Sequence, residues 1–223
     1  MNSTDVSQRW QSRDVAERYD AERFSGIIGR FFHNSQCRAM RRSLAQLNPA
    51  SRVADVPVGT GRMLPLLAEA IPSIVAIDVS EAMMQQARER VRGLGGIEFL
   101  RGDARHLPLE RCSVDGVVSI RFFMHLTREQ RVEILREYRR ITRNWILVEY
   151  DCDSPWHKIR RALRTFLLAM LGRKQSAPRS TPKRGIIEEA REAGLSVCRW
   201  HWTLRALSES VFVLMEQDGD DNP

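Results

Sequence analysis

Two glycines and three aspartates are spaced in this sequence as in a site that binds a nucleoside. Gly59 and Gly61 follow an apolar run and precede a helical pattern, an arrangement that lets the backbone pass close to a ligand. Asp55, Asp78 and Asp103 each lie at or just beyond the end of a β-like run. Carboxylates at the carboxyl ends of neighbouring parallel strands project into the crevice where such sheets bind ligands. A carboxylate there can accept hydrogen bonds from both hydroxyls of a ribose, so we expect a ligand that contains a nucleoside.

The elements that would position these residues alternate between short β-like runs and amphipathic helices from position 52 onward. This alternation is typical of a parallel sheet with helical crossovers. The glycine turn leads into a helix that begins near Met63, and Ser80 can cap the next helix. Thr127 with Gln130 three positions later has the pattern of a capping box. Five strands are predicted over 52–56, 73–78, 97–100, 114–120 and 145–150.

The two ends of the chain extend this pattern. Residues 1–50 show helical periodicity and are predicted to form a lead-in that closes over the ligand site. The runs 195–203 and 208–216 are too close together for a helical crossover, so they should pair as an antiparallel hairpin. We therefore predict one α/β domain over 51–223, with a doubly wound, seven-stranded, mostly parallel sheet that ends in an antiparallel hairpin.

The segment 52–150 resembles the class I S-adenosylmethionine-dependent methyltransferases. The run 55–61 resembles that family's acidic-x-Gly-x-Gly-x-Gly motif, and the run 75–84 resembles its second motif. One departure is Pro57, which stands where the family usually has its first glycine. The resemblance implies a Rossmann-like fold that binds S-adenosylmethionine and releases S-adenosylhomocysteine. It also implies methyl transfer, and the amphipathic basic segment described below leads us to expect the oxygen or nitrogen of a small, hydrophobic or amphiphilic acceptor.

The resemblance implies roles for individual residues as well. Gly59 and Gly61 would pass under the methionine moiety of the cofactor, Asp55 would orient its amino group and Asp78 would hold the ribose. Met83 or Met84 would pack on the adenine, with Asp103 and Ala104 near its exocyclic amine. Alternatively, Asp103 caps the turn that follows it, and the two methionines only fill a buried helix face. The other residues expected at the cofactor are Val56, Pro57, Thr60, Arg62, Val79 and Arg121, with Tyr19 and Arg23 from the lead-in.

Alignment of the acceptor with the methyl group is the main requirement of this chemistry, and a base helps a hydroxyl acceptor most. His125 shortly follows the fourth strand and is the first candidate for that base, although it could simply belong to the turn before the Thr127 helix. Tyr150 and Asp151 at the end of the fifth strand are second candidates. The histidines and the four cysteines form no ligand cluster in the sequence, so we predict no metal and reduced thiols in a cytoplasmic protein.

The net charge of +7 is concentrated in one place. The segment 158–184 contains nine Lys and Arg residues and no Asp or Glu, and its apolar residues recur at helical spacing. We predict a basic helical insertion over about 154–184. It is either a helix packed on the domain with a solvated basic side, or a lid over the acceptor pocket. As a lid, it could also make peripheral contact through 156–184 with an anionic membrane surface.

Three other interpretations share some of these features. A nicotinamide-binding domain would have a third glycine inside the helix that follows Gly61, where this chain has Arg62 and Met63. An RNA methyltransferase would suit the basic segment, but 119–125 lacks the Asn/Asp-Pro-Pro-aromatic motif that amine-modifying enzymes of nucleic acids commonly carry. A non-catalytic cofactor-binding protein of the same fold stays open.

Overall fold

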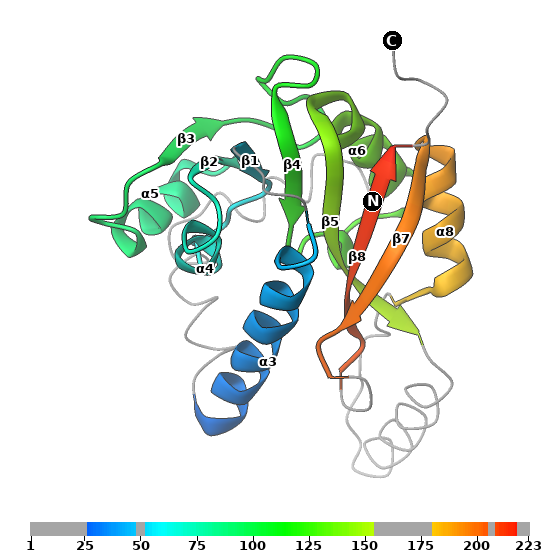
Figure 1. Ribbon diagram of the computed structural model, residues 1–223, viewed down its shortest axis with the longest axis horizontal. Coiled ribbons are helices and arrows are strands. Elements are labelled where there is room, and N and C mark those ends of the chain that lie inside the picture. Colours follow the sequence, from blue (N-terminus) through cyan, green and yellow to red (C-terminus); the bar gives the residue numbers. More distant parts are fainter. Residues whose placement is uncertain (1–25, 48–51, 154–179, 205–207, 218–223) are drawn as a thin grey trace, which may run out of the picture.

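A mixed eight-stranded sheet forms the centre of the protein (Figure 1). The computed structural model describes residues 26–47, 52–153, 180–204 and 208–217. The strands are β1 Arg52–Asp55, β2 Ser73–Asp78, β3 Ile97–Arg101, β4 Val114–Ser119, β5 Thr142–Asp153, β6 Thr181–Pro182, β7 Leu195–Trp202 and β8 Ser210–Gln217. Their order is β3-β2-β1-β4-β5-β8-β7, and β6 pairs with the end of β5.

The strand pairing confirms the predicted sheet. Strands β3, β2, β1, β4 and β5 are parallel neighbours, whereas β8 is antiparallel to both β5 and β7. The order reverses between β1 and β4, which is where doubly wound sheets open a crevice for a ligand. The sheet thus places the carboxyl end of β1 at that crevice.

Two details of the sheet differ from the prediction. Strand β6, whose two residues pair with Cys152 and Asp153, is too short to leave a periodic pattern in the sequence. Strand β5 extends beyond the expected 145–150 in both directions, because Thr142 pairs with Val114 at its start and Asp151 with Ser210 near its end. Pairing partners distant in sequence, rather than local apolar residues, extend this strand.

The helices begin and end largely at the residues that the caps indicate. The Ser80 side chain accepts from the Met83 backbone N–H, and both hydrogen bonds of the Thr127–Gln130 capping box are present. The helix after the glycine loop begins at Leu64, one residue later than expected. The helices are α3 Gly26–Leu44, α4 Leu64–Ala68, α5 Glu81–Arg90, the short 3-10 helix η1 Phe123–His125, α6 Arg128–Ile141 and α8 Lys183–Glu192.

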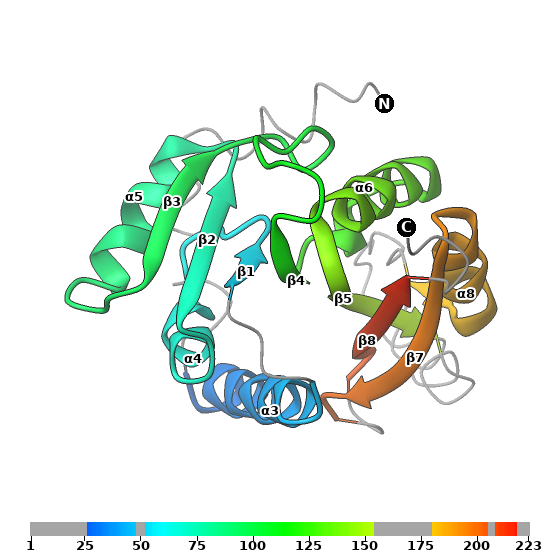
Figure 2. The same cartoon turned by 45° about the horizontal axis from the view of Figure 1, so that its top comes forward.

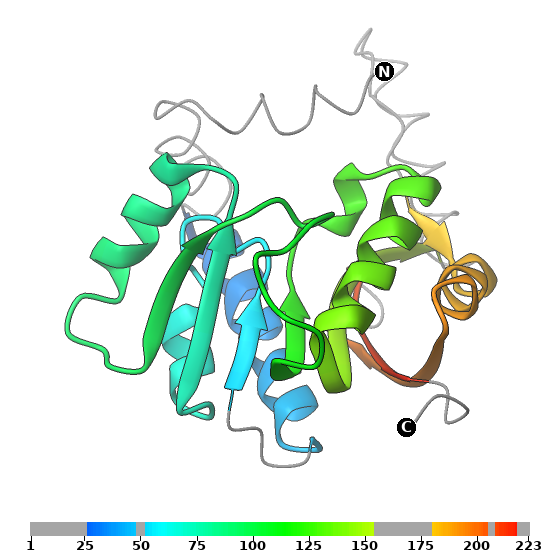
Figure 3. The ribbon, with the colours of Figure 1, turned by 90° about the horizontal axis from the view of Figure 1, so that it is seen from above.

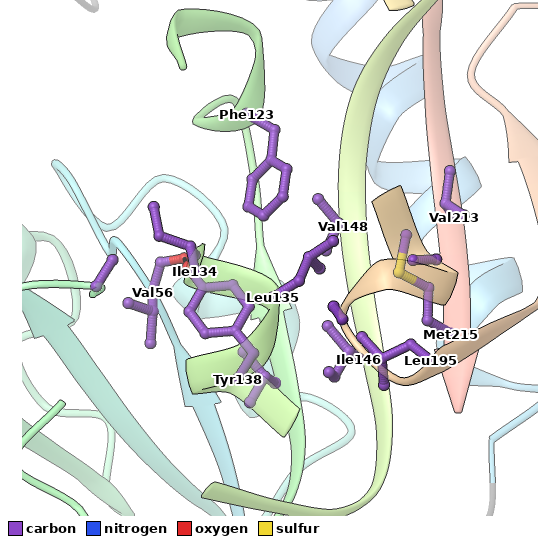
Figure 4. Packing of buried hydrophobic residues seen from close by; sticks show 14 of the residues in the cluster. Val56, Phe123, Ile134, Leu135, Tyr138, Ile146, Val148, Leu195, Val213 and Met215 are labelled. Carbon is purple, nitrogen blue, oxygen red and sulfur yellow. Dashed lines mark hydrogen bonds between the residues drawn. The ribbon is translucent and has the colours of Figure 1, made fainter. Parts of the chain in front are cut away.

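Helices cover both faces of the sheet (Figures 2 and 3). Helices α3, α4 and α5 contribute Met40, Leu64 and Ala87 to one apolar cluster. Helices α6 and α8 contribute Tyr138 and Ile186 to the cluster on the other face. Figure 4 shows the second cluster, in which side chains of α6 lie close to those of β5 and β8. Burial on both faces explains the nearly continuous apolar runs in the central strands.

Some predicted features lie outside the described residues. These are Tyr19 and Arg23 of the lead-in and most of the basic insertion, up to position 179. Helix α3 is the described part of the lead-in. Within the described ranges, no helix is both long enough and apolar enough to cross a membrane.

Candidate active site

A cleft opens at the carboxyl ends of β1, β2 and β4, where the strand order reverses. Its walls come from four segments: the glycine loop after β1, the turn from β2 into α5, residues 102–105 after β3, and the connection from β4 through η1 into α6. Predicted cofactor residues that line it are Asp55, Val56, Pro57, Gly59, Thr60, Arg62, Asp78, Val79, Met83, Asp103, Ala104 and Arg121. The sheet therefore brings together side chains that are far apart in the sequence.

The two glycines of the loop have different surroundings. Both adopt positive φ angles, 55° for Gly59 and 71° for Gly61. A Cβ atom added to Gly59 would meet no heavy atom within 4 Å, and Gly59 lines the cleft. A Cβ atom on Gly61 would lie 2.7 Å from the Cβ of Ala87, and Gly61 is not among the lining residues. Gly61 thus lets the loop pack tightly on α5. At the position of the missing first glycine, Pro57 follows a cis peptide bond.

Asp78 connects the loop to the second strand. Its side chain is buried, and its two carboxyl oxygens accept from the backbone N–H groups of Gly59 at 2.8 Å and Ser80 at 2.9 Å. Burial raises the pKa of Asp78, although these hydrogen bonds act in the opposite direction. The carboxylate is held in a fixed orientation, and its oxygens retain capacity to accept from a ligand.

Asp55 is a second buried carboxyl group in the same cleft. The residue is 3% exposed, and no donor among the described residues forms a hydrogen bond with its carboxyl group. Burial raises its pKa to about 8, and the negative charge of Asp78 contributes in the same direction. A cationic group of a ligand would stabilise the ionised form of Asp55.

The adenine-side predictions can be compared with the observed positions. Asp103 lines the cleft, but its carboxylate also accepts from the Arg105 backbone N–H at 3.0 Å and from the Arg105 guanidinium at 2.6 Å. It therefore does cap the following turn, and the hydrogen bond from Arg105 lowers its pKa. Of the two methionines, Met83 lines the cleft while Met84 belongs to the core beneath α5.

Glu149 on β5, which was not singled out from the sequence, holds the end of β4 through the backbone of Arg121. Arg121 has a φ of 58°, which is uncommon for a residue with a side chain, and its backbone N–H donates to Glu149 at 3.1 Å. Glu149 lies fully buried on β5 and also accepts from Gln36 and Ser210. A carboxylate inside the apolar run 145–150 was the available signal for this role, because buried charges need partners.

Of the candidate bases, only His125 lies in the cleft. It belongs to η1 and lines the wall together with Phe122 and Leu126. Tyr150 is fully buried in the core and its hydroxyl donates to Glu189 at 3.2 Å. Burial raises the pKa of Tyr150 well above its usual value of 10. Tyr150 and Asp151 are absent from the lining, so their positions do not support a role as base. The described residues contain no group of three or more His, Cys, Asp or Glu side chains that could hold a metal ion.

Comparisons with known proteins agree with this geometry. Residues 53–144 match the model of a methyltransferase domain family. An uncharacterized 37.1 kDa protein in a transposon of Streptomyces fradiae is 35% identical over 112 residues, which cover 48% of this chain and 32% of that protein. An uncharacterized methyltransferase of Oceanobacillus iheyensis is 30% identical over 94 residues, which cover 42% of this chain and 43% of the relative. The matched region thus spans less than half the length of these relatives.

The fold has close counterparts among solved structures. The magnesium protoporphyrin IX methyltransferase from Synechocystis, solved with bound SAH, aligns with a TM-score of 0.74 at 14% identity. The alignment covers 97% of this chain and 100% of that one. The glycine loop and its two buried aspartates lie within the residues that match the family model. Residues 53–144 are therefore a methyltransferase domain, and the fold is that of the class I S-adenosylmethionine-dependent methyltransferases.

Proposed function

We propose that the protein transfers the methyl group of S-adenosylmethionine to the oxygen or nitrogen of a small, hydrophobic or amphiphilic acceptor. The observation that carries this proposal is the placement of two buried carboxyl groups, Asp55 and Asp78, around a glycine loop at the reversal of strand order. The solved neighbour with bound SAH supports the same cofactor.

The residues of the cleft fit this cofactor. Asp78, fixed by two backbone N–H groups, would accept from the ribose hydroxyls. Asp55 would receive the ammonium group of the methionine moiety, which would provide the cation that its buried carboxyl group lacks among the described residues. Met83 would pack against the adenine. When bound, S-adenosylmethionine supplies an electrophilic methyl group for in-line displacement.

The acceptor would occupy the part of the cleft formed by the β4–α6 connection. Phe122, Leu126 and Ile134 give this wall an apolar character, which supports a hydrophobic or amphiphilic acceptor. His125 in the same wall would take a proton from a hydroxyl acceptor. An amine acceptor depends less on such a base, because it can release its proton to water.

The basic insertion would complete the acceptor side as a lid. It follows β5, and the described chain resumes at β6 and α8 beside the end of that strand. Its concentration of Lys and Arg would favour an anionic lipid surface, where each such residue contributes about 1 kcal/mol.

A transfer assay tests this function. The purified protein is incubated with S-adenosylmethionine labelled in the methyl group and with separate panels of phenols, amines, amphiphilic carboxylic acids and total RNA. We expect label in a small-molecule panel and none in RNA. Label in RNA alone would contradict the proposed acceptor class, and cofactor binding without transfer to any panel would favour a non-catalytic binding protein.

A further inference from the structure

We infer that Gln36 and Glu149 form a positioning pair that fixes two walls of the cleft relative to each other. Gln36 acts on the glycine loop through Arg62, and Glu149 acts on the wall that follows β4. This inference rests on the proposed function only in that S-adenosylmethionine or its product is taken as the ligand. Neither Gln36 nor Glu149 lines the cleft.

Glu149 anchors the acceptor-side wall. Its carboxylate is 0% exposed and accepts from the backbone N–H of Arg121 at 3.1 Å and from the Ser210 hydroxyl at 2.5 Å. Arg121 has a φ of 58°, which is disfavoured for any residue that has a Cβ atom. The hydrogen bond to Glu149 is made by the backbone N–H of this residue. Surrounding structure must stabilise such a conformation for it to persist. Glu149 provides that stabilisation at the point where β4 turns into the cleft.

Gln36 extends the connection to the glycine loop. Its side-chain nitrogen donates to both oxygens of Glu149, at 2.8 and 2.7 Å. Its side-chain oxygen accepts from Arg62 Nη2 at 2.8 Å, and Arg62 Nη1 donates to His33 Nδ1 at 2.9 Å. Arg62 lines the cleft at the end of the loop. The Gln36 side chain on α3 therefore links the Arg62 guanidinium of the glycine loop to the Glu149 carboxylate, which holds the opposite wall.

This arrangement explains the polar residues at the interface between α3 and the sheet. Gln36 is 5% exposed, and a buried amide or carboxylate is costly unless it is hydrogen-bonded. An apolar residue at position 36 would satisfy helix packing more simply. The amide can instead serve as donor to one wall and acceptor from the other, which neither a hydrocarbon nor a second carboxylate can do.

The test is titration of S-adenosylhomocysteine into apo protein by calorimetry, with melting temperatures measured in parallel. We expect Gln36→Leu to raise the dissociation constant by about tenfold, because Arg62 loses the side-chain oxygen of Gln36 as a hydrogen-bond acceptor. Ser43→Ala is the matched control on the same helix. Ser43 is also buried, and its hydroxyl is 2.8 Å from His201 Nδ1, far along α3 from the loop. This control should bind as the wild type does, even if its melting temperature falls equally.

A double-mutant cycle separates positioning from general destabilisation. If Gln36 acts through Arg62, Gln36→Leu should have little further effect on affinity in an Arg62→Ala background. Unchanged affinity in Gln36→Leu, or an equal effect with and without Arg62, would overturn the inference while leaving the proposed function intact. Absence of binding by the folded wild type would instead defeat the proposed function. Should Gln36→Leu not fold, Gln36→Asn keeps a polar amide that is too short to reach both walls.

Discussion

Two aspartates of the cleft are held in different ways, and this difference decides how each can serve a ligand. Asp78 is oriented by backbone N–H groups on both sides, so it presents a fixed acceptor. Asp55 is as deeply buried, and the negative charge of Asp78 makes its ionisation harder still. An acid whose pKa is about 8 is mostly protonated at neutral pH and ionises when a cation arrives.

Asp55→Asn should make the apo protein more stable at high pH. The folded state holds the Asp55 proton more tightly than the unfolded state, because the pKa rises from 3.8 to about 8 on folding. Wild-type stability therefore falls as pH rises between these two values, and the cost is complete above pH 8. We expect the asparagine variant to gain roughly 1–3 kcal/mol at pH 8.5 and little at pH 4. Urea denaturation at both pH values measures this, and a gain that is equal at both would contradict a titrating Asp55.

Asp55 should also link cofactor binding to proton release. If the ligand ammonium pairs with ionised Asp55, binding at pH 7 releases a proton from that carboxyl group. The calorimetric enthalpy should then depend on the ionisation enthalpy of the buffer in the wild type. Asp55→Asn should lose that dependence and bind more weakly. Buffer-independent enthalpy in the wild type would argue against this pairing.

His125→Ala should affect hydroxyl acceptors more than amines. With a hydroxyl acceptor, loss of a positioned base is expected to lower kcat by about 10²-fold or more. With an amine acceptor the loss should be within about tenfold, because water can accept the proton. Cofactor affinity should change little, so calorimetry on the same variant is the control. Equal loss with both acceptor types would assign His125 to packing of η1.

At the scale of elements, the glycine loop is shaped by two neighbours. Strand β2 fixes it through Asp78 and through the hydrogen bond from Val58 N–H to the Ile77 carbonyl at 2.8 Å. Helix α5 contacts it from behind, where Ala87 leaves room only for a glycine at position 61. The loop is therefore tied both to the sheet and to a helix, which favours a preformed cofactor site.

Alanine substitutions should separate backbone strain from steric conflict in this loop. Gly59→Ala should lower the free energy of unfolding by about 1–2 kcal/mol, because the positive φ is its only source of strain. Gly61→Ala carries that cost and also places a Cβ 2.7 Å from Ala87, so we expect a loss of about 3 kcal/mol or more. Gly95→Ala is the control, because Gly95 has neither a positive φ nor a neighbour within 4 Å. Equal destabilisation by the two loop variants, measured by urea denaturation, would contradict this packing.

The sequence predicted what depends on local pattern and missed what depends on tertiary contact. The parallel strands with helical crossovers, the Ser80 and Thr127 caps and the terminal hairpin follow from periodicity and capping chemistry, and all were confirmed. Strand β6 and the extension of β5 depend on pairing between distant residues, which no local pattern reveals.

The same distinction applies within the site. Most of the predicted cofactor residues line the cleft because motif position fixes them relative to strand ends. Tyr150 was a candidate base because it ends the strand predicted over 145–150. Side chains alternate between the two faces of a strand, however, and the Tyr150 side chain is buried in the core. Gln36 and Glu149 are 113 positions apart, so their pairing could not be read from spacing.

At the scale of the whole molecule, charge is distributed unevenly. The segment 158–184 contains the basic excess, whereas the domain around the cleft contains the buried acidic groups. If the basic segment closes over the cleft as proposed, it would suit an acceptor that is drawn from, or resembles, an anionic amphiphile.

Liposome co-sedimentation tests the membrane part of this proposal. We expect binding to vesicles that contain anionic lipid at low salt, weakened by raising the ionic strength. Neutral vesicles are the control, and a variant with Lys158, Arg160, Arg161 and Arg164 replaced by glutamine should lose binding. No sedimentation with anionic vesicles at low salt would leave the segment as a solvated face or a lid only.

The central claim is that the cleft between β1 and β4 binds S-adenosylmethionine through Asp78. Isothermal titration of S-adenosylmethionine into wild type, Asp78→Ala and the exposed control Glu98→Ala, an ion-pair partner of Arg52, tests it most directly. We expect one site in the wild type, the same affinity in the control, and a loss of about 100-fold or more in Asp78→Ala. No binding by folded wild-type protein, or wild-type affinity in Asp78→Ala, would contradict the claim.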